Sequence, residues 1–222
     1  THCFLGRELS TIFSLTKNFL SKVDLSKIDF KAIIEGRPLN LPHFKVLDIG
    51  CGFGKWGYLI RDNFDVMFYQ NFKKEDWKID ITGVEPFTKC LTPIQRETYN
   101  RIYEKDIFDI IDDLDKYDFI IMGDVIEHFE KDKAHQLLKK LFNHSDNILI
   151  STPNGFLPQN AWGGNKREIH KSGWKLEDFK DYTVVEHRVI KDEMFHDILK
   201  NITHLPESIT PDIELLVLWL KK

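Results

Sequence analysis

The residues of this sequence whose chemistry is most evident are Asp124, Glu127 and His128, in the segment Gly-Asp-Val-Ile-Glu-His-Phe. If the segment forms a short helix after a strand, its spacing places both carboxylates and the imidazole on one face. Such a group suits a divalent metal ion, or a general base, His128, with Asp124 as its orienting partner. A third interpretation is structural, with His128 only hydrogen-bonding a neighbouring loop.

A glycine-rich segment supplies the second chemical feature. Residues 46–54 read Val-Leu-Asp-Ile-Gly-Cys-Gly-Phe-Gly, and a helical pattern follows over 55–61. The segment predicts a buried strand, a tight turn and a helix start, with glycines that let the backbone approach a ligand. At the carboxyl end of a first parallel strand, such a turn binds nucleotide-like cofactors. The third glycine comes one residue early for the dinucleotide pattern, which argues against a hydride-transferring dehydrogenase.

The pattern Asp-x-Gly-x-Gly-x-Gly over 48–54 resembles motif I of the class I S-adenosylmethionine (SAM) methyltransferases. Residues 79–86, 103–108 and 117–124 resemble that family's later stations in the expected order. The resemblance implies that Glu85 accepts the ribose hydroxyls of SAM and that an acid with its apolar neighbour holds the adenine. The cofactor-binding residues implied in this way are Asp48, Gly50, Cys51, Gly52, Gly54, Glu85, Pro86, Asp106, Ile107 and Gly123.

The resemblance covers roughly residues 44–222 and implies a Rossmann-like α/β fold. This fold is a three-layer sandwich around a seven-stranded, mostly parallel sheet whose last strand is antiparallel. Residues 44–222 would form the methyltransferase domain. Residues 1–43 would form an N-terminal helical segment that either covers the site as a lid or packs against the sheet. The long interval between Gly54 and Glu85 departs from the family, and we interpret its residues 64–78 as an extended loop or extra helical turn that offers a partner surface.

Residues 153–175 are rich in Gly, Asn, Pro and Trp and predict a long ordered loop. Loops of this length inside a compact domain are usually functional. The loop follows residues 147–151, which predict a fifth strand that ends beside the methyl end of the cofactor, so we expect it to contact the substrate. Its amides and aromatic rings suit a polyhydroxylated ligand, and its cations suit a phosphate or carboxylate. The candidate substrate-binding residues are Asn154, Trp162, Arg167, His170 and Trp174.

A second resemblance concerns a metal ion. The segment Asp-Val-Ile-Glu-His, followed by Thr-Pro-Asn and by His-x-x-x-Trp at 170–174, resembles the small-RNA 2′-O-methyltransferases. Carried over by position, their magnesium ligands would be Asp124, Glu127, His128 and His170, with Mg²⁺ or Mn²⁺ as the ion. The first acid is Asp where that family has Glu, so it reaches less far. The same Glu-His element also resembles ubiquinone-pathway O-methyltransferases, which act on small phenols.

The composition of the chain limits the kinds of molecule that it is expected to bind. The chain has 222 residues and a net charge of −4, without a block of like charge, which argues against a nucleic-acid surface. Its apolar runs are shorter than the ~20 residues that span a bilayer. The three cysteines, Cys3, Cys51 and Cys90, form no paired framework and favour reduced thiols in the cytoplasm. The chain begins at Thr1, and a segment that preceded it is not excluded.

Together these patterns predict a SAM-dependent O-methyltransferase (EC 2.1.1 type) acting on a small or carbohydrate-like hydroxyl, with or without a phosphate. Segments 54–57, 152–155 and 170–174 resemble bacterial methyltransferases encoded with surface-glycan pathways, which points to polysaccharide biosynthesis. The alternatives are an RNA 2′-O-methyltransferase, and a SAM-binding partner protein without catalysis. A homodimer contact is one expected use of residues 64–78.

Overall fold

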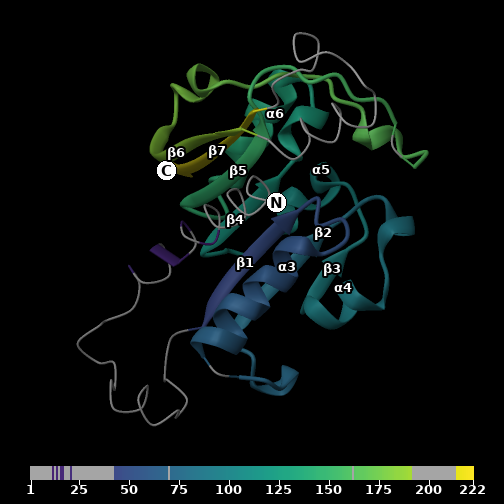
Figure 1. Cartoon of the computed structure of the whole chain (residues 1–222), viewed down its shortest axis with the longest axis vertical. Coiled ribbons are helices and arrows are strands. Elements are labelled where there is room, and N and C mark those ends of the chain that lie inside the picture. The colour runs from purple at the N-terminus through teal and green to yellow at the C-terminus, as the bar shows by residue number, and fades with distance from the viewer. Residues whose placement is uncertain are drawn as a thin grey trace.

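Seven strands form one sheet in the part of the chain that the computed structural model describes, namely residues 12, 14, 16, 17, 21, 43–69, 71–161, 163–191 and 214–222. The sheet order is β3-β2-β1-β4-β5-β7-β6 (Figure 1). Strand β7 pairs antiparallel with both neighbours, and the recorded pairs among β1 to β5 are parallel. The predicted fold class is therefore confirmed. The strand bounds are β1 Phe44–Ile49, β2 Ile79–Val84, β3 Arg101–Tyr103, β4 Phe119–Gly123, β5 Asn147–Pro153, β6 Thr183–Lys191 and β7 Glu214–Lys221.

The described helices connect the parallel strands. Helix α3 (Lys55–Ile60) begins after the glycine turn and continues as a π-helix over Arg61–Phe68. Helix α4 (Pro93–Thr98) begins with a capping box from Thr92 and a proline at its first position, which are both helix-start signals. Helix α5 (Ile107–Ile110) follows an Asp106 cap, and α6 (Lys131–Leu141) buries its apolar face as the spacing predicts. Short 3₁₀ turns cover Lys74–Asp76, Thr88–Cys90, Ile111–Asp113, Ile126–His128, Lys166–Glu168 and Leu176–Phe179.

Two hydrophobic cores, one on each face of the sheet, make the three layers. Alternate residues of each strand supply opposite faces, so Leu47 packs with α5 and α6 while Val46 packs with α3. Because both faces are covered, the parallel strands are nearly continuous apolar runs. Trp56 of α3 is buried in the second core, as expected for a core residue of the first helix. In Figure 1, α3 lies in front of β1.

The long interval before β2 is anchored by a buried ion pair. Arg61 Nη1 lies 2.6 Å from Asp65 Oδ2, and both side chains are almost fully buried. The other Asp65 oxygen accepts hydrogen bonds from the Lys78 and Ile79 amides at 2.6 and 3.2 Å, which fixes the entry into β2. The predicted extra helical turn is thus present through residue 68. Its use as a partner surface stays a prediction, which the exposed Met67 and Phe72 support.

Only five residues before His43 are described, and all five are helical. Ile12 packs against the second core, and Lys17 Nζ lies 3.1 Å from Glu186 Oε2 of β6. Ile12 and Lys17 therefore contact the domain, and the choice between a lid and a packed segment for 1–43 stays a prediction. The apolar spacing of residues 25–34 also predicts a helix, but this segment lies outside the described residues, and the division at residue 43 stays a prediction. Across the described residues, no helix is long and apolar enough to cross a membrane.

Candidate active site

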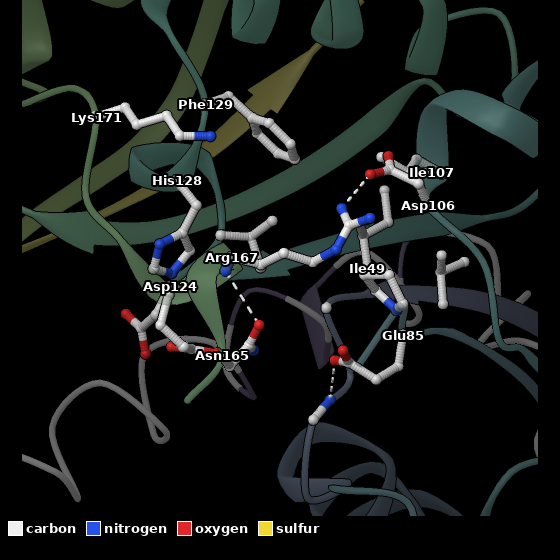
Figure 2. Close-up of a pocket in the computed structure, with 16 residues that line it drawn as sticks. Ile49, Glu85, Asp106, Ile107, Asp124, His128, Phe129, Asn165, Arg167 and Lys171 are labelled. Carbon is white, nitrogen blue, oxygen red and sulfur yellow. Dashed lines mark hydrogen bonds and ion pairs between the residues drawn. The ribbon is translucent and has the colours of Figure 1, made fainter. Parts of the chain in front are cut away.

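A pocket opens at the carboxyl ends of β1, β2 and β4, where the strand order reverses between β1 and β4 (Figure 2). Ligands of open α/β sheets bind at such a switch point. Of the predicted cofactor residues, the pocket wall includes Gly50, Gly52, Glu85, Pro86, Asp106 and Ile107. The other residues that line the pocket are Ile49, Val84, Asp124, Val125, His128, Phe129, Asn165, Arg167, Glu168 and Lys171.

The glycine turn has the backbone that its sequence predicts. Gly50, Gly52 and Gly54 have φ angles of 69°, 48° and 83°, a left-handed region that other residues rarely adopt. A Cβ atom on Gly50 would also lie 2.5 Å from Val125 Cγ2. The Gly50 amide donates to the Val84 carbonyl at 2.8 Å, so the turn is bonded to the end of β2.

Glu85 connects the turn to the pocket. Its carboxylate accepts the Gly52 amide at 3.0 Å and the Phe87 amide at 2.7 Å, and the side chain is buried. Burial raises the pKa of Glu85, while the two amides act in the opposite direction. Each carboxylate oxygen keeps a further lone pair, so the geometry fits two ribose hydroxyls of SAM.

Four predicted cofactor residues do not line this pocket of the described chain, and their contact with the cofactor stays a prediction. Gly54 caps α3, and the Cys51 side chain is buried in the second core. A Cβ atom on Gly123 would lie 2.1 Å from Trp56 Nε1, so this glycine makes room for the indole. Asp48 is fully buried, and its Oδ2 accepts the Tyr99 hydroxyl at 2.5 Å.

Asp48 makes stability depend on pH. Burial raises its pKa to about 7, against the hydrogen bond from Tyr99 and the charge of Lys55, with Glu85 adding to the rise. Between about pH 4 and 7 the folded chain therefore holds a proton that the unfolded chain has released. As the pH rises through this range, the free energy of unfolding of the native chain should therefore fall relative to that of Asp48→Asn. Denaturant titrations of both proteins at pH 5 and pH 8 check this, and an equal pH dependence would contradict it.

Arg167 reaches across the pocket to Asp106. Its Nη1 makes an ion pair with Asp106 Oδ2, while Asp106 Oδ1 caps α5 by accepting the Phe108 amide at 3.1 Å (Figure 2). The volume of the pocket is about 150 Å³. Pockets that bind small ligands usually have at least ~300 Å³. Arg167 thus occupies the carboxylate that is expected to hold adenine, and we predict that its side chain shifts when SAM binds.

Arg167→Ala should therefore bind SAM more tightly while losing activity toward an anionic acceptor. The gain should be at most about fivefold, because an ion pair with a half-exposed partner is worth only ~0–1 kcal/mol. Calorimetric titration with SAM measures the Kd, and Lys166→Ala, an exposed neighbour, is the control. A weaker Kd in Arg167→Ala would show instead that the arginine supports the cofactor.

The expected single helical face for Asp124, Glu127 and His128 is wrong. Asp124 has a φ of 58°, and the short 3₁₀ turn begins only at Ile126. The Asp124 amide bonds the Ser151 carbonyl at 2.8 Å, and its side chain lines the pocket. Glu127 is buried and accepts the Thr152 hydroxyl at 2.9 Å. The two carboxylates therefore lie in different surroundings.

Three of the four predicted metal ligands do come together. Ligand atoms of Glu127, His128 and His170 all lie within 4.8 Å of one another, and the two imidazole centroids are 4.9 Å apart. The cluster does not include Asp124. His170 Nδ1 lies 2.6 Å from the Leu157 carbonyl, a geometry in which Nδ1–H donates and Nε2 keeps its lone pair. These residues fit a metal ion of the two-histidine, one-carboxylate type.

His128 is suited to accept a proton. It lines the pocket, and burial lowers its pKa, with the neighbouring His170 acting in the same direction and Glu168 opposing it. A lowered pKa keeps the imidazole neutral at neutral pH, which a base or a metal ligand requires. Its Nδ1 lies 3.4 Å from the Ile169 carbonyl, so the ring also touches the long loop, as the structural interpretation expects.

The long loop places only part of the predicted substrate set at the pocket. Arg167 lines it, and His170 lies against His128. Trp174 is fully buried in the first core with its Nε1 bonded to Ser172 Oγ at 2.9 Å, so its assignment to substrate is wrong. Asn154 Nδ2 donates to Glu214 Oε2 of β7 at 2.8 Å, a structural contact. Trp162 lies outside the described residues.

Besides Asn165, one of the amides of the predicted loop, the pocket includes residues that sequence reasoning missed. Asn165 accepts the Arg167 amide at 3.0 Å and so shapes the turn that presents the arginine. Lys171 and Phe129 also line the pocket. Their neighbours in the sequence, His170 and His128, were the available signal, since adjacent residues of a loop or a 3₁₀ turn can face the same cavity.

This combination of sheet order, glycine turn and buried acid at the end of β2 defines a class I SAM-dependent methyltransferase. Residues 8–201 match the family model described as a methyltransferase domain, which is most of the chain, and the chain belongs to that family. A search of curated proteins finds no match.

Solved structures share the fold at low sequence identity. The cyclopropane synthase MmaA2 from Mycobacterium tuberculosis is 13% identical, with a TM-score of 0.55 over 82% of this chain and 79% of that one. A cyclopropane-fatty-acyl-phospholipid synthase-like protein from Lactobacillus casei is 12% identical, with a TM-score of 0.55 over 82% and 85%. Coclaurine N-methyltransferase, bound to N-methylheliamine and SAH, is 15% identical, with a TM-score of 0.52 over 87% and 71%.

Proposed function

We propose that this enzyme transfers the methyl group of SAM to a hydroxyl of a small, carbohydrate-like acceptor that carries an anionic group. The observation that carries the proposal is the position of His128, a neutral imidazole on the wall of the pocket that Arg167 and Lys171 also line. SAM supplies a methyl group on a positively charged sulfur, and the chain must supply the means to activate the acceptor.

His128 would act as the general base. An amine needs only deprotonation near neutral pH, but a hydroxyl needs a base or a metal ion beside it. His128 is neutral at that pH, and the Asp124 side chain lines the same pocket. In this proposal, His128 accepts the hydroxyl proton, and the charge of the neighbouring Glu168 favours the imidazolium that forms. The role of Asp124 as a catalytic partner of His128 stays a prediction.

The cations define the acceptor class. Arg167 and Lys171 are both exposed residues of the loop, and both line the pocket. In a chain of net charge −4, two cations at one pocket favour an anionic ligand such as a phosphate or carboxylate. A small acceptor is also in keeping with the ligand N-methylheliamine of the similar N-methyltransferase structure. The proposal that the acceptor resembles a carbohydrate is supported by the polar residues of the pocket wall, Asn165 and Asp124 among them.

A metal-assisted reaction is the second candidate, and the cluster of Glu127, His128 and His170 favours it. In that case His128 would be a ligand, and the ion would lower the pKa of the acceptor hydroxyl. Two imidazoles suit Mn²⁺ better than Mg²⁺, because Mg²⁺ prefers oxygen ligands. The same cluster is the basis for the alternative RNA acceptor, since its sequence resembles the small-RNA enzymes.

Methyl transfer from labelled SAM separates these proposals. The purified enzyme is incubated with a small-metabolite fraction containing nucleotide-sugars, and with short RNA, each with and without a chelator. Label in the metabolites that survives the chelator supports His128 as the base, and label that disappears supports the metal. Label in RNA alone would contradict the proposed acceptor, and SAM binding without transfer to either fraction would favour the non-catalytic alternative. A cytoplasmic location, a homodimer and a role in polysaccharide biosynthesis stay predictions.

A further inference from the structure

Helix α4 packs against the glycine turn through two side chains, Gln95 and Tyr99, which belong to no cofactor motif. Gln95 is fully buried, and Tyr99, the residue after the helix, is nearly so. A Cβ atom on Gly54 would lie 3.0 Å from Gln95 Cγ and 3.4 Å from Tyr99 Cε2, so the turn packs directly on both residues.

Gln95 holds the backbone carbonyl of Gly52 by a hydrogen bond. Its Nε2 donates to the Gly52 carbonyl at 2.8 Å and to the Cys90 carbonyl at 3.0 Å. Its Oε1 accepts the Thr92 amide at 2.9 Å, which determines the orientation of the side-chain amide. The Gly52 amide donates to Glu85 at 3.0 Å. The pocket acid and Gln95 therefore hold the same residue from its two sides.

Tyr99 supplies the cap that α3 lacks. The first amides of a helix have no partner inside it, and a side chain at the N-cap usually accepts one of them. The N-cap of α3 is Gly54, which has no side chain, and the Tyr99 hydroxyl accepts the Gly57 amide at 3.1 Å instead. The same hydroxyl donates to Asp48 Oδ2 at 2.5 Å, which joins the end of β1 to the start of α3.

The glycine pattern of the chain fits this arrangement. A Cβ atom on Gly57 would lie 2.4 Å from Tyr99 Cζ, and one on Gly83 would lie 3.0 Å from Tyr99 Cδ1. Both glycines therefore make room for the tyrosine ring between β2 and α3, and neither lines the SAM pocket of the described residues.

We propose that Gln95 and Tyr99 are positioning residues for SAM binding, because they hold the glycine turn and Glu85 in the geometry that receives the cofactor. Neither side chain lines the pocket, so each acts through the turn. They preform the site at the carboxyl ends of β1 and β2, and the cofactor then need not order the turn when it binds.

Two near-isosteric variants test this role. Tyr99→Phe keeps the ring and removes the hydroxyl. Gln95→Met keeps the volume and removes the hydrogen bonds that the side-chain amide makes with Gly52, Cys90 and Thr92. We expect each to weaken the calorimetric Kd for SAM by about tenfold, equivalent to 1.4 kcal/mol. The control is Thr98→Ala, which loses only a hydrogen bond inside α4, from Thr98 Oγ1 to the Ile94 carbonyl at 2.7 Å. Its Kd should stay within about twofold of the native value.

Thermal unfolding of the three variants separates positioning from general stability. If Tyr99→Phe and Gln95→Met remain folded at the assay temperature, as their Tm values show, and bind SAM more weakly than Thr98→Ala does, the proposal holds. An unchanged Kd in both would overturn it. Should both variants fail to fold, amide exchange in the native chain remains decisive: Gly52 and Gly57 should be protected before SAM is added, and protection that arises only with SAM would overturn a preformed turn.

Discussion

His128→Ala should lower methyl transfer by roughly 10²–10⁴-fold, the range over which a positioned acid or base accelerates a reaction. The calorimetric Kd for SAM should change little, because His128 contacts the loop at Ile169 and His170 and makes no recorded bond to the glycine turn. Loss of turnover with intact SAM binding assigns the imidazole to the acceptor side of the pocket.

The matched control is His144→Ala. The His144 side chain lies 3.1 Å from the Asp115 carbonyl, outside the residues that line the pocket, so its loss should leave turnover unchanged. His128→Gln tests whether hydrogen bonding alone suffices, since an amide cannot take up the proton. Turnover of His128→Ala at the native rate would contradict both the base and the ligand role, and would leave the histidine a structural contact to its loop.

The pH dependence of the methyl-transfer rate tests the same role of His128. Because burial lowers the pKa of His128, its neutral form should prevail through neutral pH. The native rate should therefore fall only as the pH drops below the ordinary histidine range near 6.5. An acid limb lying well above that range would contradict a lowered pKa.

Glu85→Ala should weaken SAM binding by at least about 100-fold. Two ribose hydroxyls donating to a charged carboxylate contribute roughly 1.5–3 kcal/mol each, so their joint loss should exceed the 2.7 kcal/mol that corresponds to that factor. The substitution also leaves the Gly52 and Phe87 amides without their acceptor, which loosens the turn itself. Calorimetry with SAM, followed by a thermal scan of the same sample, measures both effects.

Glu97→Ala is the control for this substitution. Glu97 is an exposed acid whose Oε2 lies 3.0 Å from Lys74 Nζ, and among the described residues it does not line the pocket. Its Kd for SAM should match that of the native chain. If Glu85→Ala bound SAM as tightly as this control, the ribose role of Glu85 would be wrong. Glu85→Gln, which keeps the volume, shows how much of the loss is due to the charge.

The fold was predictable because its signals are local. Buried parallel strands are apolar along their length, and the glycine spacing over 48–54 marks the turn by itself. Glu85 and Asp106 stand directly at strand or helix ends, so their places at the pocket followed from the strand assignment. The apolar residues of 131–142 are likewise spaced as on one face of a helix, and α6 forms there.

The predictions that were wrong concern residues whose position is set by an unusual backbone conformation or by packing against residues far away in the sequence. Asp124 adopts a left-handed φ, which Asp tolerates better than most residues, and the change of direction separates it from Glu127. Trp174 follows a polar loop in sequence, yet Phe179 and His135 enclose its ring. The Tyr99 contacts join residues 42 and 51 positions apart, and no periodicity or motif in the sequence marks such pairs.

The measurement that tests the central claim most directly is a crystal structure of the chain with S-adenosylhomocysteine. We expect the ribose hydroxyls on Glu85, the adenine beside Asp106 and Ile107 with Arg167 displaced, and the sulfur directed toward His128. A nucleoside bound elsewhere, or a sulfur directed away from His128, would contradict the assignment of this pocket as the site of methyl transfer.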